Sequence, residues 1–310
     1  MPMPTQEFRI STPLHRRAFL RHGTLCLAGL GGALFAKDES GTAKPAPAVR
    51  VGIVTDLHYA DKESTKTRFY RETPRKLEEV VQRFNAEKPD FVVELGDLID
   101  QAATVEQEIA WLDEIEKVFA KVTSPRHYVL GNHCVATLTK AEFIAHTGAS
   151  KTSHYSFDHG GVHFVILDAC YRSDGEPYGR SNAEWTDANI PAAELAWLRE
   201  DLKKHTSPVV VFAHQRLDEA DKHSVKNAAE VRAVLEASGH VSAVLQGHSH
   251  KNAYQQVNGI HYVTLAALIE GSGEENNSYG MLEVMSNGAL RIKGYRKMQA
   301  RELEGVKRKA

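Results

Sequence analysis

Two histidines one residue apart, His248 and His250, follow an apolar run and a glycine in the stretch LQGHSH. Imidazole is the most common metal ligand in proteins, and this spacing is typical of metal sites. Four other stretches join an apolar run to a short polar cluster, at 54–61, 94–100, 130–134 and 211–215. Their candidate ligands are Asp56, His58, Asp97, Asn132 and His214. Mixed carboxylate and imidazole ligands suit Mn, Fe or Zn better than Ca, which prefers oxygen ligands alone.

The segments around these clusters indicate how they could be brought together. Short β-branched runs at 49–56, 91–97 and 127–132 predict buried strands, with amphipathic helices at 73–88 and 105–122 between them. The second half predicts a hairpin formed by 154–157 and 162–169, helices at 191–205 and 228–237, and strands at 208–213, 241–246, 260–266, 279–285 and 289–295. This order predicts an α/β domain with mixed sheets. In such folds ligands gather beyond the carboxyl ends of strands, where every polar cluster lies.

Each stretch is a weak signal when taken alone, but together they resemble the calcineurin-like metallophosphoesterase superfamily over nearly all of residues 50–295. The resemblance implies the αββα fold of that superfamily, in which two mixed β-sheets pack as a sandwich flanked by helices. It also implies two metal sites that share Asp97. Asp56, His58, Asp97 and His250 would hold one ion, and Asp97, Asn132, His214 and His248 would hold the other.

Such a pair of ions is suited to the hydrolysis of phosphoesters. Two cations about 3.5–4 Å apart can clamp phosphate oxygens, and one carboxylate can bridge them. Metal binding lowers the pKa of water from about 15.7 to about 7, so that hydroxide is available at neutral pH. A bridging hydroxide can then attack phosphorus in line with the leaving oxygen. The resemblance therefore implies a dinuclear phosphohydrolase that uses Mn, Fe or Zn.

His133 follows Asn132 and is not assigned to a metal. The resemblance implies that His133 faces the substrate and stabilises or protonates the leaving oxygen, with a hydrogen-bonding role behind the ligands as the alternative. The superfamily usually continues this motif with Asp or Glu, where this chain has Cys134. A thiol orients an imidazole poorly, so either another acid replaces it or His133 is less basic. We interpret Cys134 as a small packing residue, with redox sensitivity as the alternative.

The chain further resembles the Mn²⁺-dependent ADP-ribose/CDP-alcohol diphosphatases, which hydrolyse the pyrophosphate of nucleoside diphosphate-X compounds. The similarity lies in the segments 59–62, 68–85, 261–271 and 279–284. At the position of His58 that subgroup tends to carry Gln. A phosphomonoesterase, a cyclic-nucleotide phosphodiesterase and a non-catalytic metal- or phosphate-binding protein remain alternatives.

The long polar loop at 170–191 is the expected specificity element, because long loops over a site are usually functional or disordered. Tyr171 and Arg172 are the candidate substrate-binding residues, with Arg180 and Trp185 as further candidates to stack a base or pair with a second phosphate. The alternative is a solvated loop whose aromatic rings pack on the domain. His205 and His223 lie in charged contexts and are expected at the surface.

The net charge of only −2 gives no reason to expect a nucleic-acid polymer as a partner. The resemblance instead implies a small phosphorylated substrate. Three cysteines argue against a disulfide framework and leave a bridge between Cys134 and Cys170 open.

Residues 1–36 resemble a twin-arginine export signal, since Arg16 and Arg17 precede Phe19, Leu20 and a mildly apolar run. A short amphipathic helix or a membrane anchor is the alternative. The run falls short of the about 20 residues that span a bilayer, so we expect no stable membrane span. We expect the twin-arginine machinery as a partner and a periplasmic or extracellular location. The remaining chain is divided into a Pro/Ala linker at 37–48, the catalytic domain at 49–296 and a basic C-terminal tail at 297–310.

Overall fold

The computed structural model describes residues 19–21, 24–26, 46–148 and 150–305. Contacts between residues divide the chain into two units, 1–44 and 45–310. In the first unit, β1 (Phe19–Arg21) and β2 (Thr24–Cys26) form an antiparallel pair. Most of the predicted export signal and linker lies outside the described residues, so both stay predictions. No helix within the described ranges is long and apolar enough to cross a membrane.

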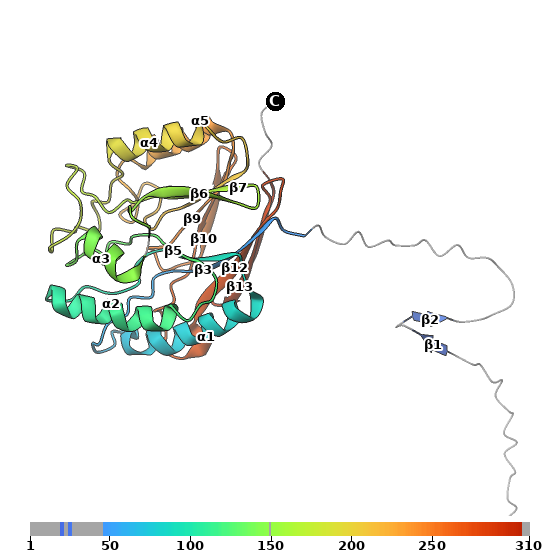
Figure 1. Ribbon diagram of the computed structural model, residues 1–310, viewed down its shortest axis with the longest axis horizontal. Helices are drawn as coiled ribbons and strands as arrows, with labels where there is room; N and C mark the ends of the chain where they lie inside the picture. Colours follow the sequence, from blue (N-terminus) through green and yellow to red (C-terminus); the bar gives the residue numbers. More distant parts are fainter. Residues whose placement is uncertain (1–18, 22–23, 27–45, 149, 306–310) are drawn as a thin grey trace, which may run out of the picture. The chain divides into compact units, whose positions relative to one another are not determined.

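The second unit contains a six-stranded sheet in the order β14-β13-β12-β3-β4-β5. Its parallel strands are β3 (Val49–Val54), β4 (Phe91–Glu94) and β5 (Arg126–Tyr128). Its antiparallel strands are β12 (Ser278–Val284), β13 (Leu290–Arg296) and β14 (Arg301–Leu303). The helices α1 (Thr73–Glu87) and α2 (Val105–Phe119) connect the parallel strands and, with α3 (Lys140–Thr147), lie on one side of the unit (Figure 1).

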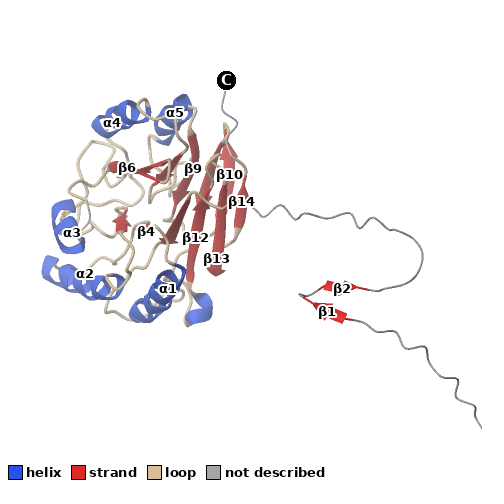
Figure 2. Ribbon diagram, turned by 45° about the vertical axis from the view of Figure 1, so that its right-hand side comes forward, coloured by secondary structure: helices blue, strands red, loops and turns tan. Residues whose placement is uncertain are grey.

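The other sheet has the order β10-β11-β9-β8-β7-β6. The strands β7 (Val162–Ile166), β8 (Val209–Phe212), β9 (Val241–Gln246) and β11 (Ile260–Thr264) are parallel. The edge strands β6 (Tyr155–His159) and β10 (Ala253–Val257) pair antiparallel with their neighbours. The helices α4 (Ala192–Leu202) and α5 (Ala228–Ser238) lie on the side opposite α1 and α2 (Figure 2).

Each sheet has a hydrophobic core on both faces, because successive side chains of a strand point to opposite faces of the sheet. In β3, Val51 and Ile53 enter the core between the sheets, where they join Phe164 and Phe212 of the other sheet. Val54, by contrast, belongs to the separate core under α1 and α2. A third core lies between α4, α5 and the second sheet. The predicted αββα sandwich is therefore confirmed.

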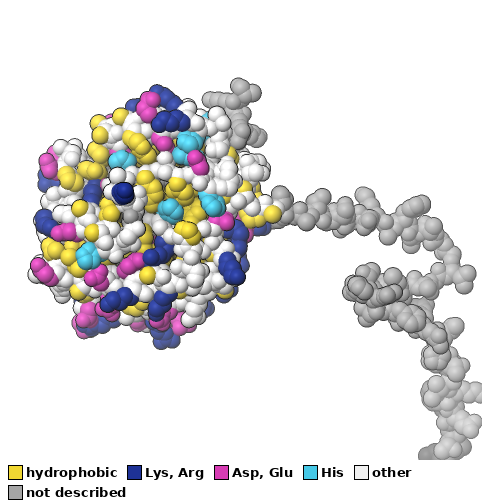
Figure 3. All heavy atoms as spheres, viewed as in Figure 1, with side chains coloured by type: hydrophobic (Ala, Val, Ile, Leu, Met, Phe, Trp, Pro, Cys, Tyr) yellow, Lys and Arg dark blue, Asp and Glu magenta, His cyan; other side chains and the backbone are white. Residues whose placement is uncertain are grey.

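Among the α-helices and strands of residues 46–305, the structure adds α3, β10 and β14 to those expected from the sequence. The helix α3 begins with a capping box, in which Thr139 and Glu142 satisfy each other's backbone N–H groups. Residues 301–303, which we expected in a basic tail, instead form β14, because Leu303 is buried beside Leu290 of β13. On the face shown in Figure 3, acidic and basic side chains lie mainly around the periphery, and histidines are visible beside hydrophobic side chains.

Candidate metal centre

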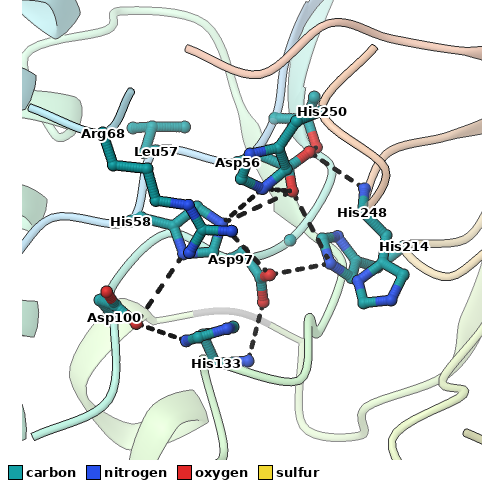
Figure 4. A network of polar contacts seen from close by, with 12 residues as sticks. Asp56, Leu57, His58, Arg68, Asp97, Asp100, His133, His214, His248 and His250 are labelled. Carbon is teal, nitrogen blue, oxygen red and sulfur yellow. Dashed lines mark hydrogen bonds and ion pairs between the residues drawn. The ribbon is translucent and has the colours of Figure 1, made fainter. Parts of the chain in front are cut away.

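Polar loops from both sheets meet where the parallel strands end. The loops after β3 and β4 carry Asp56, His58 and Asp97, and the loops after β8 and β9 carry His214, His248 and His250 (Figure 4). Asn132, which follows β5, lines the same cavity as His58 and Asp97. The fold thus brings together all the ligands expected from the sequence, although they come from segments far apart in the chain.

The first group of facing ligand atoms comes from Asp56, His58 and His250. His250 Nε2 lies 3.2 Å from Asp56 Oδ1 and 3.0 Å from His58 Nε2. His58 Nε2 lies 3.4 Å from Asp97 Oδ2, which links this group to the next one. Two imidazole nitrogens and two carboxylate oxygens therefore face one small volume, as the ligands of a metal ion do.

The second group comes from Asp97, His214 and His248. His214 Nε2 lies 3.0 Å from the same Asp97 Oδ2 that faces His58. The other ring nitrogen of His214 lies 2.8 Å from the carbonyl oxygen of Leu95, an arrangement that aims Nε2 into the site. Asp97 Oδ1 accepts a hydrogen bond from the His133 backbone, which fixes the carboxylate between the two groups. Asp97 therefore has the position of a bridging ligand.

Unpartnered buried atoms show that the residues fit metal ions. Asp56 Oδ1, Asn132 Oδ1, His214 Nε2 and His248 Nε2 are buried without a hydrogen-bond partner. Buried polar atoms are otherwise almost always paired, because leaving one unpaired costs about 1–3 kcal/mol. These four atoms belong to expected ligands, although other buried atoms of the described residues, such as Glu94 Oε2 and Tyr262 Oη, also lack a partner. A pair of cations would satisfy the four ligand atoms together.

The backbone of the site adopts conformations that non-glycine residues rarely adopt. Asp56, His58, Asp97, His248 and His250 all have φ between 46° and 67°. This left-handed region costs an L-residue about 1–2 kcal/mol, and such strain persists where the surroundings impose it. The turns aim each side chain beyond the end of its strand, toward the centre.

Two glycines of the motifs allow the loops to approach each other this closely. A Cβ atom on Gly131 would lie 2.2 Å from Asp97 Oδ1 and 2.3 Å from the Asp97 backbone nitrogen. A Cβ atom on Gly247 would lie 2.4 Å from Thr55 Oγ1 and 2.6 Å from Asp56 Oδ2. The Asp97 backbone and the buried side chains of Asp97, Thr55 and Asp56 cannot move aside cheaply, so the motifs require glycine before Asn132 and His248.

Burial and neighbouring charges shift the pKa values of the site residues. Burial by itself raises the pKa of a carboxyl group, yet nearby histidines hold the pKa of Asp56 and that of Asp97 well below their usual range. Burial lowers the pKa of His58 to about 4 and that of His248 to about 3. Burial opposes protonation of His214 and His250 too, but the carboxylates outweigh it and raise each pKa to about 9. Since metal ligands must be deprotonated, a cation would displace the protons that His214 and His250 carry.

A supporting contact that the sequence did not reveal orients His250. Its Nδ1 lies 2.7 Å from Glu270 Oε1, in the loop after β11. The buried ammonium group of Lys76 in α1 donates to the carbonyl oxygens of Leu268 and Gly271 in the same loop. Lys76 thereby holds Glu270 in place, and Glu270 fixes which His250 nitrogen faces the site.

Asp100 contacts His133 in place of the acidic residue that the superfamily usually has at the position of Cys134. Asp100 Oδ1 lies 2.5 Å from His133 Nδ1, and Lys62 Nζ lies 2.5 Å from the other carboxylate oxygen. Burial would lower the pKa of His133, but Asp97 and Asp100 outweigh it and raise that pKa.

Cys134 is fully buried in the core under α1 and α2, which agrees with a packing role. Cys134 and Cys170 are both free, so the bridge left open above does not form.

A cavity of about 350 Å³ opens over the centre. Beside the expected ligands and His133, its walls include Arg68, Trp185 and His223. His223, which was expected at the surface for its charged context, has 28% of its side chain exposed, and its ring also lies 5.7 Å from that of His248. Tyr171 and Arg172 do not line this cavity. The Tyr171 ring packs against Lys140 Nζ at 3.2 Å, and Arg172 pairs with Asp174.

Comparison with known proteins agrees with this geometry. The calcineurin-like phosphoesterase family model matches residues 49–252. The chain belongs to this family. It is therefore a metallophosphoesterase, a hydrolase that acts on phosphoester or phosphoanhydride bonds.

Several known proteins are similar to this chain over most of its length. A manganese-dependent ADP-ribose/CDP-alcohol diphosphatase of Arabidopsis thaliana is 24% identical over 311 residues, covering 85% of this chain and 99% of that protein. A 3',5'-cyclic-nucleotide phosphodiesterase of Nostoc is 23% identical over 224 residues, covering 69% of this chain and 76% of that protein. A dimetal phosphatase of Danio rerio has the same fold, with a TM-score of 0.73, 19% identity, and coverage of 84% of this chain and 99% of that one.

Replacing Glu270 by Gln should weaken metal binding at the His250 half of the centre. Loss of an outer partner of a metal-binding histidine typically costs about 10- to 100-fold in affinity. Calorimetric titration of the metal-stripped protein with Mn²⁺ measures this directly. Glu274→Gln is the matched control, because Glu274 pairs with Arg75 at the surface nearby. Equal affinities of wild type and Glu270→Gln would show that this contact does not support the site.

Removing the Asp100 carboxylate should impair protonation of the leaving group. We expect Asp100→Asn and His133→Ala to lower kcat for an alkyl ester by up to about 10²- to 10⁴-fold, the usual contribution of a general acid. With p-nitrophenolate, which leaves without protonation, both losses should be much smaller. Asp61→Asn, which changes an exposed carboxylate, should leave kcat for both esters unchanged. Equal losses on both esters would exclude the acid role.

Proposed function

We propose that the protein binds two Mn²⁺ ions and hydrolyses the pyrophosphate bond of nucleoside diphosphate-X compounds. The proposal rests on the two sides of the cavity, which carry different side chains. Arg68 lies on the His250 side, with its Nε 3.9 Å from Glu270 Oε1. Trp185 lies on the other side, with its ring 6.0 Å from that of His248. A substrate with phosphates over the centre could thus place a base on Trp185 and a polar X group near Arg68.

The side chains of the Trp185 side suit a nucleotide. Trp185 is 38% exposed, so part of its ring is open to a stacking partner. Lys222 Nζ lies 5.5 Å from the same ring, and the His223 ring in the cavity wall lies 5.5 Å from that of Trp185 and 5.7 Å from that of His248. The diphosphatase of Arabidopsis thaliana, which matches this chain over 99% of its own length, supports the same substrate class.

Cleavage of a 3',5'-cyclic nucleotide is the second candidate. The Nostoc phosphodiesterase supports it, and so does a 3',5'-cyclic adenosine monophosphate phosphodiesterase of Haemophilus influenzae that is 27% identical over 221 residues. A cyclic nucleotide carries a single phosphate and no X group. It would use the Trp185 side of the cavity and leave the Arg68 side without a contact.

The residues of the chain have separate tasks in the proposed reaction. Bound cations would polarise the phosphate oxygens and lower the pKa of a water molecule. Asp56, Asp97 and the imidazoles would hold those cations. His133, oriented by Asp100, would give a proton to the leaving phosphate oxygen. Arg68 would neutralise charge on the second phosphate.

We also propose that residues 1–36 direct the protein to the twin-arginine export machinery, which places the enzyme in the periplasm or outside the cell. The paired residues Arg16 and Arg17 support this proposal. Twin-arginine export carries folded proteins, so the metal ions could be bound before export.

A substrate panel tests the proposed reaction. With Mn²⁺ present, kcat/KM should be highest for ADP-ribose or CDP-choline and lower for 3',5'-cyclic AMP and p-nitrophenyl phosphate. The physical reason is that only a pyrophosphate substrate contacts both sides of the cavity. A higher kcat/KM for the cyclic nucleotide would select the second candidate, and activity on the monoester alone would exclude both.

Replacing Trp185 by Ala should raise KM for the preferred nucleotide substrate. Stacking of a base on an aromatic side chain is worth about 1–3 kcal/mol, which corresponds to roughly 5- to 150-fold in affinity. Hydrolysis of bis(p-nitrophenyl) phosphate, which has no base, should change less. Tyr254→Ala is the control, because Tyr254 is equally exposed and lies on β10 outside the cavity wall. An unchanged KM for the nucleotide would show that Trp185 does not bind the base.

A further inference from the structure

Trp185, which reaches the cavity over the metal centre, lies at the corner of a tight turn. The backbone N–H of Asp187 donates to the carbonyl oxygen of Glu184 at 2.8 Å, which makes Trp185 the second residue of a β-turn. Glu184 Oε1 also accepts hydrogen bonds from the hydroxyl and the backbone N–H of Thr186, at 2.8 and 3.3 Å. These bonds fix the shape of the turn, but they do not fix the direction in which the turn faces.

Tyr178 ties this turn to the interior of the domain. Its hydroxyl donates to the same carbonyl oxygen of Glu184 at 2.6 Å. The Tyr178 side chain is buried in the core under α1 and α2, and its backbone N–H donates to the carbonyl oxygen of Cys170 at 3.0 Å. The Tyr178 ring is therefore held firmly, and its hydroxyl sets where the first residue of the turn lies.

The chain is anchored on both sides of the turn. Before it, the guanidinium group of Arg180 donates two hydrogen bonds to the carboxylate of Glu142 at the start of α3, at 2.7 and 2.5 Å. After it, the carbonyl oxygen of Ala188 accepts a hydrogen bond from the backbone N–H of Lys226 at 2.7 Å. The contact with Tyr178 thus acts on a short segment whose two ends are already in place.

The exposure of Trp185 makes this backbone contact important for its indole ring. The ring is 38% exposed, so packing covers only part of it. Its centroid lies 5.5 Å from that of His223 and 6.0 Å from that of His248. A rotation of the turn would carry the indole away from both histidines and out of the cavity wall.

We propose that Tyr178 is a positioning residue, whose hydroxyl orients Trp185 for stacking on the base of the substrate by holding the Glu184 carbonyl group. The inference rests on the proposed function, since it needs a base on Trp185. Tyr178→Phe is a suitable test because it removes only the hydroxyl. The Glu184 carbonyl oxygen keeps its hydrogen bond from Asp187, so the substitution leaves no buried polar atom of this pair without a partner.

Kinetics in two backgrounds tests the proposal. Tyr178→Phe should raise KM for the preferred nucleotide substrate by about 2- to 10-fold, the usual contribution of one hydrogen bond, and leave kcat unchanged. Hydrolysis of bis(p-nitrophenyl) phosphate, which has no base, should not change. In the Trp185→Ala background, Tyr178→Phe should have no effect on KM, because a residue that acts through Trp185 needs the indole. An equal rise in both backgrounds would overturn the proposal, as would no rise where Trp185→Ala itself raises KM.

Tryptophan fluorescence tests the position of the indole without any substrate. The difference in emission between wild type and Trp185→Ala isolates Trp185 from the two other tryptophans, Trp111 and Trp197. Acrylamide should quench this difference signal more strongly after Tyr178→Phe, because a displaced indole is more exposed. Equal quenching with and without the Tyr178 hydroxyl would overturn the proposal. If quenching increases but Trp185→Ala leaves KM unchanged, Tyr178 positions Trp185 and the base-binding part of the proposed function fails.

Tyr279→Phe is the matched control. Tyr279 is also buried, and its hydroxyl donates to Glu79 of α1 at 3.0 Å, away from the cavity wall. This variant should keep the KM and the acrylamide quenching of wild type. Changes as large as those of Tyr178→Phe would show that the loss of any buried tyrosine hydroxyl disturbs Trp185, which would overturn the specific role of Tyr178.

Discussion

Two carboxylates, Asp56 and Asp97, lie almost completely buried at the junction of the two sheets. The effective cost of burying an unpaired ion is several kcal/mol, so such a group becomes neutral unless positive charge lies beside it. Here the surrounding imidazoles keep both carboxylates ionised, and metal ions would do so more strongly. The strained backbone of the ligands and the glycines that let the loops touch serve this one requirement, which is to hold negative oxygens where cations can reach them.

The same requirement explains the layered fold around the centre. Parallel strands of both sheets end at one rim, and the core between the sheets fixes the distance between the two sets of loops. His214 and Asp97 come from different sheets, yet their ligand atoms are 3.0 Å apart. A shift of one sheet against the other would separate the halves of the centre. Packing in the core is therefore as important to the site as the ligands themselves.

The sequence allowed prediction of the ligands because each one follows directly after a buried strand. It did not allow prediction of Glu270 and Lys76, since their roles arise when α1 packs against the loop after β11. Asp100 lies in one of the motifs, but its pairing with His133 depends on how two loops fold together. The loop at 170–191 was expected to bind substrate through Tyr171 and Arg172, whereas Trp185 of that loop reaches the cavity. The long periodic helices and buried strands were predicted, and the short elements α3, β10 and β14 were not, because few residues carry their pattern.

The most direct measurement of the shared centre is anomalous diffraction from crystals grown with Mn²⁺. Two peaks about 3.5–4 Å apart are expected, the usual spacing of such pairs, with Asp97 between them. One peak should contact Asp56, His58 and His250, and the other should contact Asn132, His214 and His248. A single ion at this rim, or two ions without Asp97 as a common ligand, would contradict the bridged arrangement.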